Sequence, residues 1–147
     1  MRYHACITRS IIIIYFICTA SAGIAQFKAG SVNWTKDGTG LYEIQDNMLL
    51  RINPLSAQQV TVLATAAQLT PREKDNPLTI ADFEISADEN TLLIFTNTAR
   101  VWRYNTRGDY WVLNRGTGQL KQIGKDRPAQ SLMYAKLSPD GKKVGYV

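Results

Sequence analysis

Short runs of alternating apolar and polar residues, separated by turn residues, fill this chain after its first 25 residues. Three stretches share one pattern: an apolar residue is followed by Ser or Thr, one further residue, Asp and a turn residue. Strand-type residues stand on both sides of each turn, so each stretch predicts a strand, a turn and a strand. The three stretches are Val32–Tyr42, Phe83–Phe95 and Ala135–Val147.

The copies recur at a nearly constant spacing. Asp37, Asp88 and Asp140 stand 51 and 52 residues apart. A period of about 40 to 50 residues with short alternating strands is typical of β-propellers, in which four-stranded blades pack face to face. An Asp-containing turn is common to many hairpins, so the prediction rests on the period more than on the motif.

The intervals between the copies predict the remaining strands of each sheet. Each interval contains two alternating segments on either side of a polar turn, which is the pattern of a hairpin. The paired segments are 47–53 with 60–63, around a turn at 54–59, and 110–113 with 120–123, around a turn at 114–119.

Three other segments complete the pattern. Residues 99–104 alternate and predict one more strand. The charged stretch 71–77, with a proline at each end, predicts the connection between two sheets. Residues 57–69 have a short helix as an alternative, although their β-branched residues favour a strand.

The predicted fold class is all-β: an incomplete β-propeller of about two and a half four-stranded blades, preceded by a signal peptide. We expect a first blade at about residues 27–70, a second at 78–125 and the start of a third at 132–147. So few blades do not close a ring, so residues 26–147 are expected to be the N-terminal fragment of a propeller domain. Its unpaired edges would favour aggregation.

The first 25 residues have a different composition. They contain two arginines and no acidic residue, then an apolar run at 11–17, then small residues up to Ala25. This order predicts a secretory signal peptide, and therefore a secreted or periplasmic protein. The apolar run is shorter than the roughly 20 residues that span a bilayer, so a membrane anchor at 11–25 is the alternative.

Removal of this leader would change the chemistry of the chain. The single histidine, His4, and both cysteines, Cys6 and Cys18, lie inside it. Residues 26–147 therefore lack a thiolate nucleophile, a Cys/His metal site and the imidazole of a Ser-His-Asp triad. We expect no catalytic residue, metal site or cofactor in this part of the chain.

The charge pattern argues against a nucleic-acid partner. Loss of Arg2 and Arg9 with the leader lowers the formal net charge from +5 to +3. The remaining lysines and arginines are scattered singly or in pairs, without the dense basic stripe that neutralises many phosphates.

Three features of the second half occur in a characteristic order. They are the Phe-Glu-Ile-Ser-Ala-Asp run at 83–88, the Val-Trp-Arg-Tyr run at 101–104 followed by Tyr-Trp-Val-Leu at 110–113, and the Ser-Pro-Asp-Gly stretch within 133–147. Through them, residues 80–147 resemble the N-terminal propeller of the dipeptidyl peptidase IV family, a branch of the prolyl oligopeptidase superfamily of serine peptidases. Residues 27–79 match more loosely.

The resemblance implies a longer parent protein. Members of the family continue through the rest of the propeller into a C-terminal α/β-hydrolase domain that carries the catalytic serine, aspartate and histidine. This chain would then be the N-terminal propeller fragment of a serine exopeptidase, gating and binding peptide substrates for proteolysis by that absent domain. The resemblance also allows for a homodimer of the intact protein.

One substrate-binding residue follows from the resemblance. In the family, the arginine directly after the tryptophan of this strand hydrogen-bonds a carbonyl of the bound peptide, and here that residue is Arg103. A guanidinium suits the task because it stays charged and offers several donors in a fixed fork. The alternative from composition alone is that Arg103 pairs with a nearby carboxylate such as Asp109.

The remaining candidates have structural interpretations. The family's paired glutamates are expected beyond residue 147, so the acidic residues here are interpreted as solvated surface and the aromatic residues as packing between blades. The alternative function is a non-catalytic propeller that binds other proteins of the cell envelope. The acidic residues are Glu73, Glu84 and Glu89, and the aromatic residues are Trp34, Trp102, Tyr104, Tyr110 and Trp111.

Overall fold

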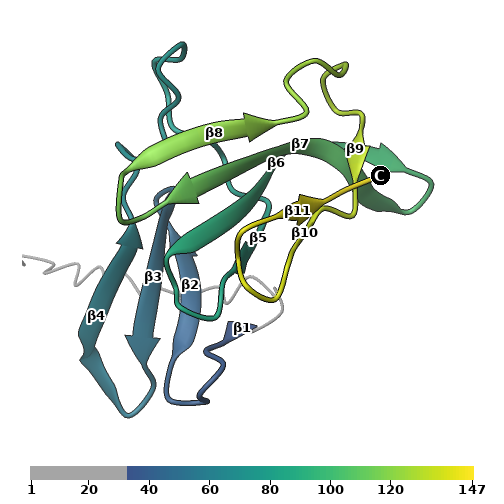
Figure 1. Cartoon of the computed structure of the whole chain (residues 1–147). Coiled ribbons are helices and arrows are strands. Elements are labelled where there is room, and N and C mark those ends of the chain that lie inside the picture. The colour runs from purple at the N-terminus through teal and green to yellow at the C-terminus, as the bar shows by residue number, and fades with distance from the viewer. Residues whose placement is uncertain (1–32) are drawn as a thin grey trace, which may run out of the picture. The chain divides into compact units, whose positions relative to one another are not determined.

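The computed structural model describes residues 33–147, which consist of β-strands joined by turns and loops (Figure 1). These residues contain no helix, and the predicted all-β fold class is confirmed. The expected signal peptide lies outside the described residues. The strands are β1 (Asn33–Trp34), β2 (Leu41–Gln45), β3 (Met48–Asn53), β4 (Ser56–Ala64), β5 (Asp82–Ile85), β6 (Thr91–Val101), β7 (Tyr104–Asn114), β8 (Gln119–Ile123), β9 (Leu132–Met133), β10 (Lys136–Leu137) and β11 (Val144–Gly145).

Strands β1 to β4 form an antiparallel sheet in sequential order. The turn between β3 and β4 is shorter than predicted, because residues 56–59 belong to β4. The side chain of Asn53 closes this turn: its Oδ1 accepts a hydrogen bond from the Leu55 backbone N–H at 2.9 Å. The strand interpretation of residues 57–69 holds as far as Ala64, and the residues after it form turns.

Strands β5 to β8 form a second sheet in the same sequential order. Strand β9 pairs with β7 at Arg107 and Gly108, near the start of β7. Strands β10 and β11 form a separate hairpin (Figure 1). The prediction of one strand at residues 99–104 is wrong as a continuous element, because the chain reverses at Trp102 and Arg103, while residues 99–101 and Tyr104 are in strands. Strand β6 ends at Val101 and β7 begins at Tyr104, directly opposite it.

The main core lies between the four-stranded first sheet and the five-stranded second sheet. Leu49 and Leu63 of the first sheet pack with Leu92 and Leu113 of the second, and all four are at most 3% exposed. Full burial of one such side chain contributes about 1.5–3 kcal/mol. The hydrophobic effect therefore holds the two sheets face to face.

A smaller core lies on the other face of the second sheet. Leu93, Tyr110 and Leu132 form it, with Leu137 and Val144 of the C-terminal hairpin packed against them. Strand β6 is thus covered on both faces. This explains why its first half is a continuous apolar run rather than an alternating one.

The three sequence repeats fold into the same hydrogen-bonded turn. In each, the Ser or Thr hydroxyl donates to the Asp carboxylate two positions later, at 2.6, 2.5 and 2.6 Å. The same hydroxyl accepts the backbone N–H five positions later, at 2.9 Å in all three. The repeat inferred from sequence is therefore a repeated structure.

The fourth residue of each turn has a left-handed backbone. Gly38 and Gly141 have φ of 68° and 67°, while Glu89 occupies the equivalent position with φ of 54°. Glycine adopts this conformation without steric cost, whereas glutamate does not. The glutamate that replaces glycine at this position therefore has a steric cost. The interactions of the Glu89 side chain, with Tyr42 and Arg51, compensate for it.

Candidate functional site

The hairpin between β6 and β7 projects from the molecule and carries the predicted site residue. Only Trp102 and Arg103 connect the paired residues Val101 and Tyr104. Trp102 has φ of 59°, a left-handed conformation that is rare for a bulky residue. This conformation reverses the chain and places Arg103 at the tip.

The hairpin tip is open to solvent. Trp102 is 94% exposed and Tyr104 is 73% exposed, so neither packs between sheets as predicted. The packing prediction is also wrong for Trp34, which is 57% exposed. It is confirmed for Tyr110 and Trp111, which are each 7% exposed and belong to the two cores.

Within residues 33–147, Arg103 makes no hydrogen bond or ion pair. The alternative pairing with Asp109 is not formed, because that carboxylate is already engaged. Its Oδ2 accepts Asn97 Nδ2 and its Oδ1 accepts the Gln130 backbone N–H, both at 2.8 Å. The Arg103 guanidinium is therefore available to a ligand.

A set of polar contacts, which we call the Asp109 clamp, fixes the base of the hairpin to the segment before β9. Besides the two bonds to Asp109, Gln130 Nε2 donates to Asn97 Oδ1 at 3.1 Å. Arg107 Nε donates to the Gln130 carbonyl at 3.1 Å. Sequence reasoning did not find this clamp, which joins residues up to 33 positions apart. It gives the projecting hairpin a defined position.

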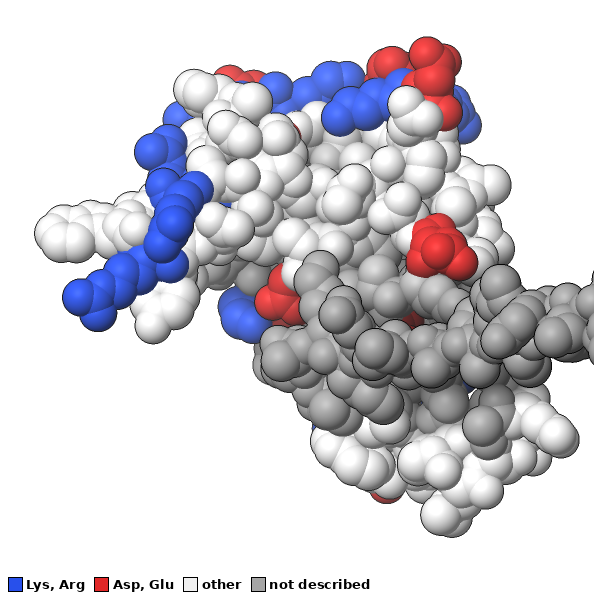
Figure 2. All heavy atoms as spheres, turned by 180° about the vertical axis from the view of Figure 1, so that it is seen from behind, with Lys and Arg blue, Asp and Glu red and all other residues white. Residues whose placement is uncertain are grey.

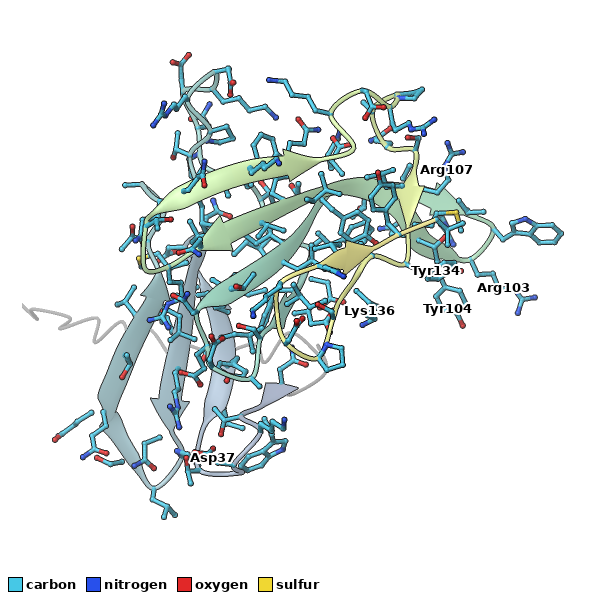
Figure 3. The ribbon with its side chains drawn as sticks, viewed as in Figure 1. Asp37, Arg103, Tyr104, Arg107, Tyr134 and Lys136 are labelled. Carbon is cyan, nitrogen blue, oxygen red and sulfur yellow. The ribbon has the colours of Figure 1, made fainter. Side chains whose placement is uncertain are left out.

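Cationic side chains gather at this end of the molecule. Arg100, Arg103 and Arg107 are all exposed on the hairpin, and Figure 2 shows a group of basic side chains at the projecting end. In Figure 3, Arg103 and Tyr104 extend to one side of the hairpin and Arg107 to the other. The side that carries Arg103 also presents Tyr134 and Lys136.

A second polar region lies at the opposite end, where the repeat turns meet. A groove of about 860 Å³ is lined by all three turns. Hydrogen bonds from the Thr35 hydroxyl and from Thr39 hold the pKa of Asp37 well below its ordinary value. Equivalent bonds from Ser86 and Ser138 lower the pKa of Asp88 and Asp140. The three aspartates are thus bound within their own turns.

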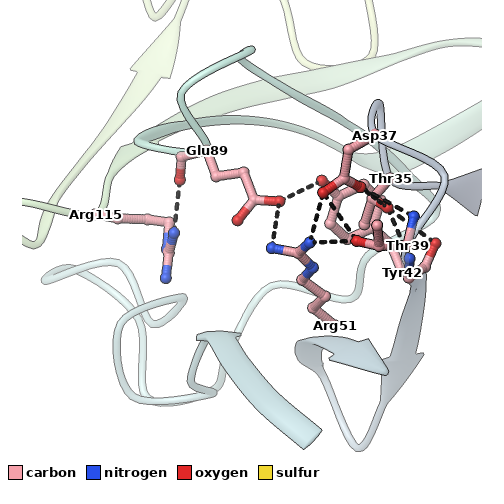
Figure 4. Close-up of polar contacts among 8 residues, drawn as sticks. Thr35, Asp37, Thr39, Tyr42, Arg51, Glu89 and Arg115 are labelled. Atoms are coloured by element: carbon pink, nitrogen blue, oxygen red, sulfur yellow. Dashed lines mark hydrogen bonds and ion pairs between the residues drawn. The ribbon is translucent and has the colours of Figure 1, made fainter. Parts of the chain in front are cut away.

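Two glutamates, Glu84 and Glu89, line this groove and link structural elements. The interpretation of Glu73, Glu84 and Glu89 as solvated surface is therefore wrong for these two. Glu89 accepts the Tyr42 hydroxyl at 2.7 Å and pairs with Arg51 Nη1 at 3.5 Å (Figure 4). Glu84 accepts the Leu137 backbone N–H at 3.2 Å and joins the C-terminal hairpin to the second sheet. Only Glu73, whose side chain is 69% exposed, fits the prediction.

Arginines complete the connection between the sheets. Arg115 donates to the carbonyls of Leu63 and Glu89, each at 2.7 Å, and so joins the first sheet to the repeat turn of the second (Figure 4). Burial, followed by the hydrogen bond to Glu89, raises the pKa of the Tyr42 hydroxyl far above its ordinary value. This region is therefore built for stability, with its polar groups satisfied by one another.

The described residues hold no cluster of three or more metal-ligating side chains. No helix long and apolar enough to cross a membrane occurs among residues 33–147.

Comparisons with known proteins identify similar sequences. Residues 86–147 match a family model described as the dipeptidyl peptidase IV (DPP IV) N-terminal region. Dipeptidyl aminopeptidase B of Saccharomyces cerevisiae is 31% identical over 70 residues, covering 48% of this chain and 8% of the relative. A putative dipeptidyl aminopeptidase of Schizosaccharomyces pombe is 26% identical over 65 residues, covering 44% of this chain and 8% of the relative.

The fold is also shared with a solved structure. Dipeptidyl peptidase 4 of Porphyromonas gingivalis superposes with a TM-score of 0.66 at 22% identity, over 79% of this chain and 16% of that protein. The all-β arrangement matches the N-terminal propeller fold of that enzyme. The chain spans only a small part of each of these proteins.

Proposed function

From the match of residues 86–147 to the N-terminal region of the dipeptidyl peptidase IV family, we propose that the chain is the N-terminal propeller segment of a serine exopeptidase that releases dipeptides. In the whole protein the two large sheets are the first two blades, and the C-terminal hairpin opens the third. The propeller admits short peptides and binds them, while a separate α/β-hydrolase domain performs the hydrolysis. The leader directs the protein to the periplasm or the exterior.

The observation that carries this proposal is the exposed, unpaired guanidinium of Arg103 on a hairpin held at its base. The Asp109 clamp fixes the base of the hairpin, so binding at its tip costs less backbone entropy than binding by a free loop would. The residue stands at the far end of β6 from the core between the sheets. Ligand binding there would leave the core undisturbed.

In the proposed mechanism Arg103 binds and does not react. Its guanidinium donates to a carbonyl oxygen of the peptide, a charge-assisted bond that is stronger than one between neutral groups. Fixing that carbonyl places the scissile bond opposite the serine of the hydrolase domain, which is a contribution of orientation.

The proposal is tested in the full-length protein with Arg103→Ala. Loss of one hydrogen bond to a charged group, worth about 1.5–3 kcal/mol, is expected to lower kcat/KM for dipeptide-releasing substrates about 10- to 100-fold. Arg103→Lys should recover part of the loss, because lysine keeps the charge but not the fork. Circular dichroism and the unfolding midpoint should not change.

Arg100→Ala is the matched control, since it removes an exposed arginine from the same hairpin. It should leave kcat/KM within about twofold of wild type, as surface substitutions generally do. Equal kinetics for wild type and Arg103→Ala would overturn the role of Arg103. A full-length protein without any peptidase activity would favour the non-catalytic envelope propeller instead.

A further inference from the structure

A cavity of about 190 Å³ opens at the base of the β6–β7 hairpin. Its lining comes from β5, from the distal part of the second sheet and from the segment between β9 and β10. Asn105, two positions after Arg103, forms part of its rim. The cavity therefore reaches the hairpin that carries the proposed carbonyl-binding residue, although Arg103 itself does not line it.

The interior of the cavity is aromatic. Phe95 and Tyr110 stack with their ring centroids 4.7 Å apart and their planes at 25°. Gly108 makes room for this stack, because a Cβ at that position would overlap the Phe95 ring. Tyr110 is 7% exposed, and its position is fixed by the surrounding core. The stack thus forms a rigid apolar surface.

One wall of the cavity is an aromatic side chain in an unusual position. Tyr134 is 61% exposed although it adjoins a buried cluster, and its backbone φ is 53°. Left-handed conformations of bulky residues concentrate at ligand-binding and catalytic sites. Trp102 and Gln130, both with φ of 59°, lie in the hairpin and in the clamp beside it. Of these three residues, Tyr134 lines the cavity.

The rim of the cavity is polar. Lys136 Nζ lies 3.8 Å from Glu84 Oε2, and the same oxygen accepts the Leu137 backbone N–H. The charge of Lys136 is offset in this way, while the carboxylate of Asp82, whose Oδ1 accepts the Phe83 backbone N–H at 2.8 Å, also lines the cavity. The cavity therefore combines an aromatic interior with a rim that disfavours an anionic group.

We propose that this cavity binds one aromatic side chain of the peptide whose carbonyl Arg103 holds. The inference rests on the proposed function and adds a substrate class to it. A volume of about 190 Å³ is below the range of roughly 300–1,000 Å³ that whole small-molecule ligands occupy, and it suits a single side chain. A phenylalanine or tyrosine ring would contact Tyr134 on one side and the Phe95–Tyr110 stack on the other. Figure 3 shows Tyr134 on the same side of the hairpin as Arg103.

The test measures binding to the full-length protein of tripeptides with a non-hydrolysable second bond. One peptide contains only alanine, and the others carry phenylalanine at the first, second or third position. We expect phenylalanine at one position to tighten binding about 3- to 10-fold, the factor that one aromatic pair supplies. The same ratio should appear in kcat/KM for the cleavable peptides.

Tyr134→Ala should bring this ratio close to one, while Tyr134→Phe should preserve it. A second variant, Asn105→Trp, fills the cavity from its exposed rim and should also abolish the preference. Tyr104→Ala is the matched control, because it removes an exposed aromatic residue of the same hairpin that does not line the cavity. It should leave the ratio unchanged.

Failure of this inference and failure of the proposed function give different results. Arg103→Ala should weaken the alanine and phenylalanine peptides equally, because both present the same carbonyl. If Arg103→Ala weakens both but Tyr134→Ala leaves the ratio as in wild type, the proposed function stands and the cavity assignment is wrong. Absence of any phenylalanine preference in the wild-type protein would overturn the assignment as well.

Discussion

The two ends of strand β6 lie in very different environments. At its start, Leu92, Leu93 and Ile94 are at most 2% exposed and contact the cores on both faces of the sheet. Just beyond its end, Trp102 is 94% exposed. Arg103 makes no hydrogen bond or ion pair with any described residue. One strand therefore connects the part of the molecule that supplies stability with the part that is free to bind.

This contrast teaches that stability and binding should respond to different substitutions. The buried end is satisfied internally, both in its apolar core and in the Arg115 and Glu89 contacts that join the sheets. The hairpin end keeps its aromatic rings and guanidinium in solvent, a state that costs little folding energy and leaves these groups available. Three substitutions test this contrast, with expected effects on stability that decrease from the first to the last.

Leu113→Ala should produce the largest loss of stability. The side chain is fully buried between the sheets, and its truncation is expected to destabilise the protein by about 2–5 kcal/mol. Urea unfolding followed by tryptophan fluorescence measures the change. Trp102→Ala, at the other end of β6, should stay within about 0.5 kcal/mol of wild type. Comparable losses for the two variants would contradict the contrast.

Arg115→Ala should have an intermediate effect. It removes two hydrogen bonds, both at 2.7 Å, to carbonyls of Leu63 and Glu89. Hydrogen bonds to a charged group contribute about 1.5–3 kcal/mol, so a loss of this size is expected in the same unfolding experiment. Arg115→Lys should restore only part of it, because lysine cannot reproduce the fork. Arg100→Ala is the control, and an equal loss there would show that the inter-sheet bonds contribute nothing.

Asp88→Asn should have the smallest effect, and that effect should depend on pH. The pKa of Asp88 is lowered first by the hydrogen bond from the Ser86 hydroxyl and then by that from the Asn90 backbone. Because the folded pKa is below the unfolded one, the ionised carboxylate stabilises the fold above the unfolded pKa of about 3.9. That stabilisation is lost as the pH falls through the folded value.

Thermal unfolding between pH 6 and pH 2 measures this effect. Wild type should be more stable than Asp88→Asn at pH 6, and the difference should shrink as the pH falls below about 4. Asp75→Asn, in the exposed connection between the sheets, should show no such trend. A constant difference across the whole range would mean that the Asp88 carboxylate does not stabilise the turn through its charge.

Local patterns made the fold predictable. Each repeat turn is closed by a hydroxyl and a carboxylate two positions apart, so the residues that form it stand next to each other in the sequence. The alternating segments on either side then identify most of the strands. Glu89 is the exception within the repeat, and its partners Tyr42 and Arg51 lie in the other sheet, where no local pattern reveals them.

The hairpin tip was mispredicted for a related reason. Residues 99–104 alternate as a strand does, and the two residues of the turn are Trp102 and Arg103 rather than the glycine or asparagine that usually mark a two-residue turn. The long-range Asp109 clamp helps to hold this unusual turn in place. The residue identity of the candidate site could be inferred by resemblance, whereas its exposure and support could not.

The closure of each repeat turn over five positions also bears on how the chain folds. All strand pairs within the two sheets except β7 with β9 join neighbours along the sequence, and such short-range contacts favour rapid folding. During synthesis, the first sheet can form before the second has left the ribosome. Each later sheet would then dock its apolar side onto one already assembled, so the protein could grow stepwise from its N-terminal end.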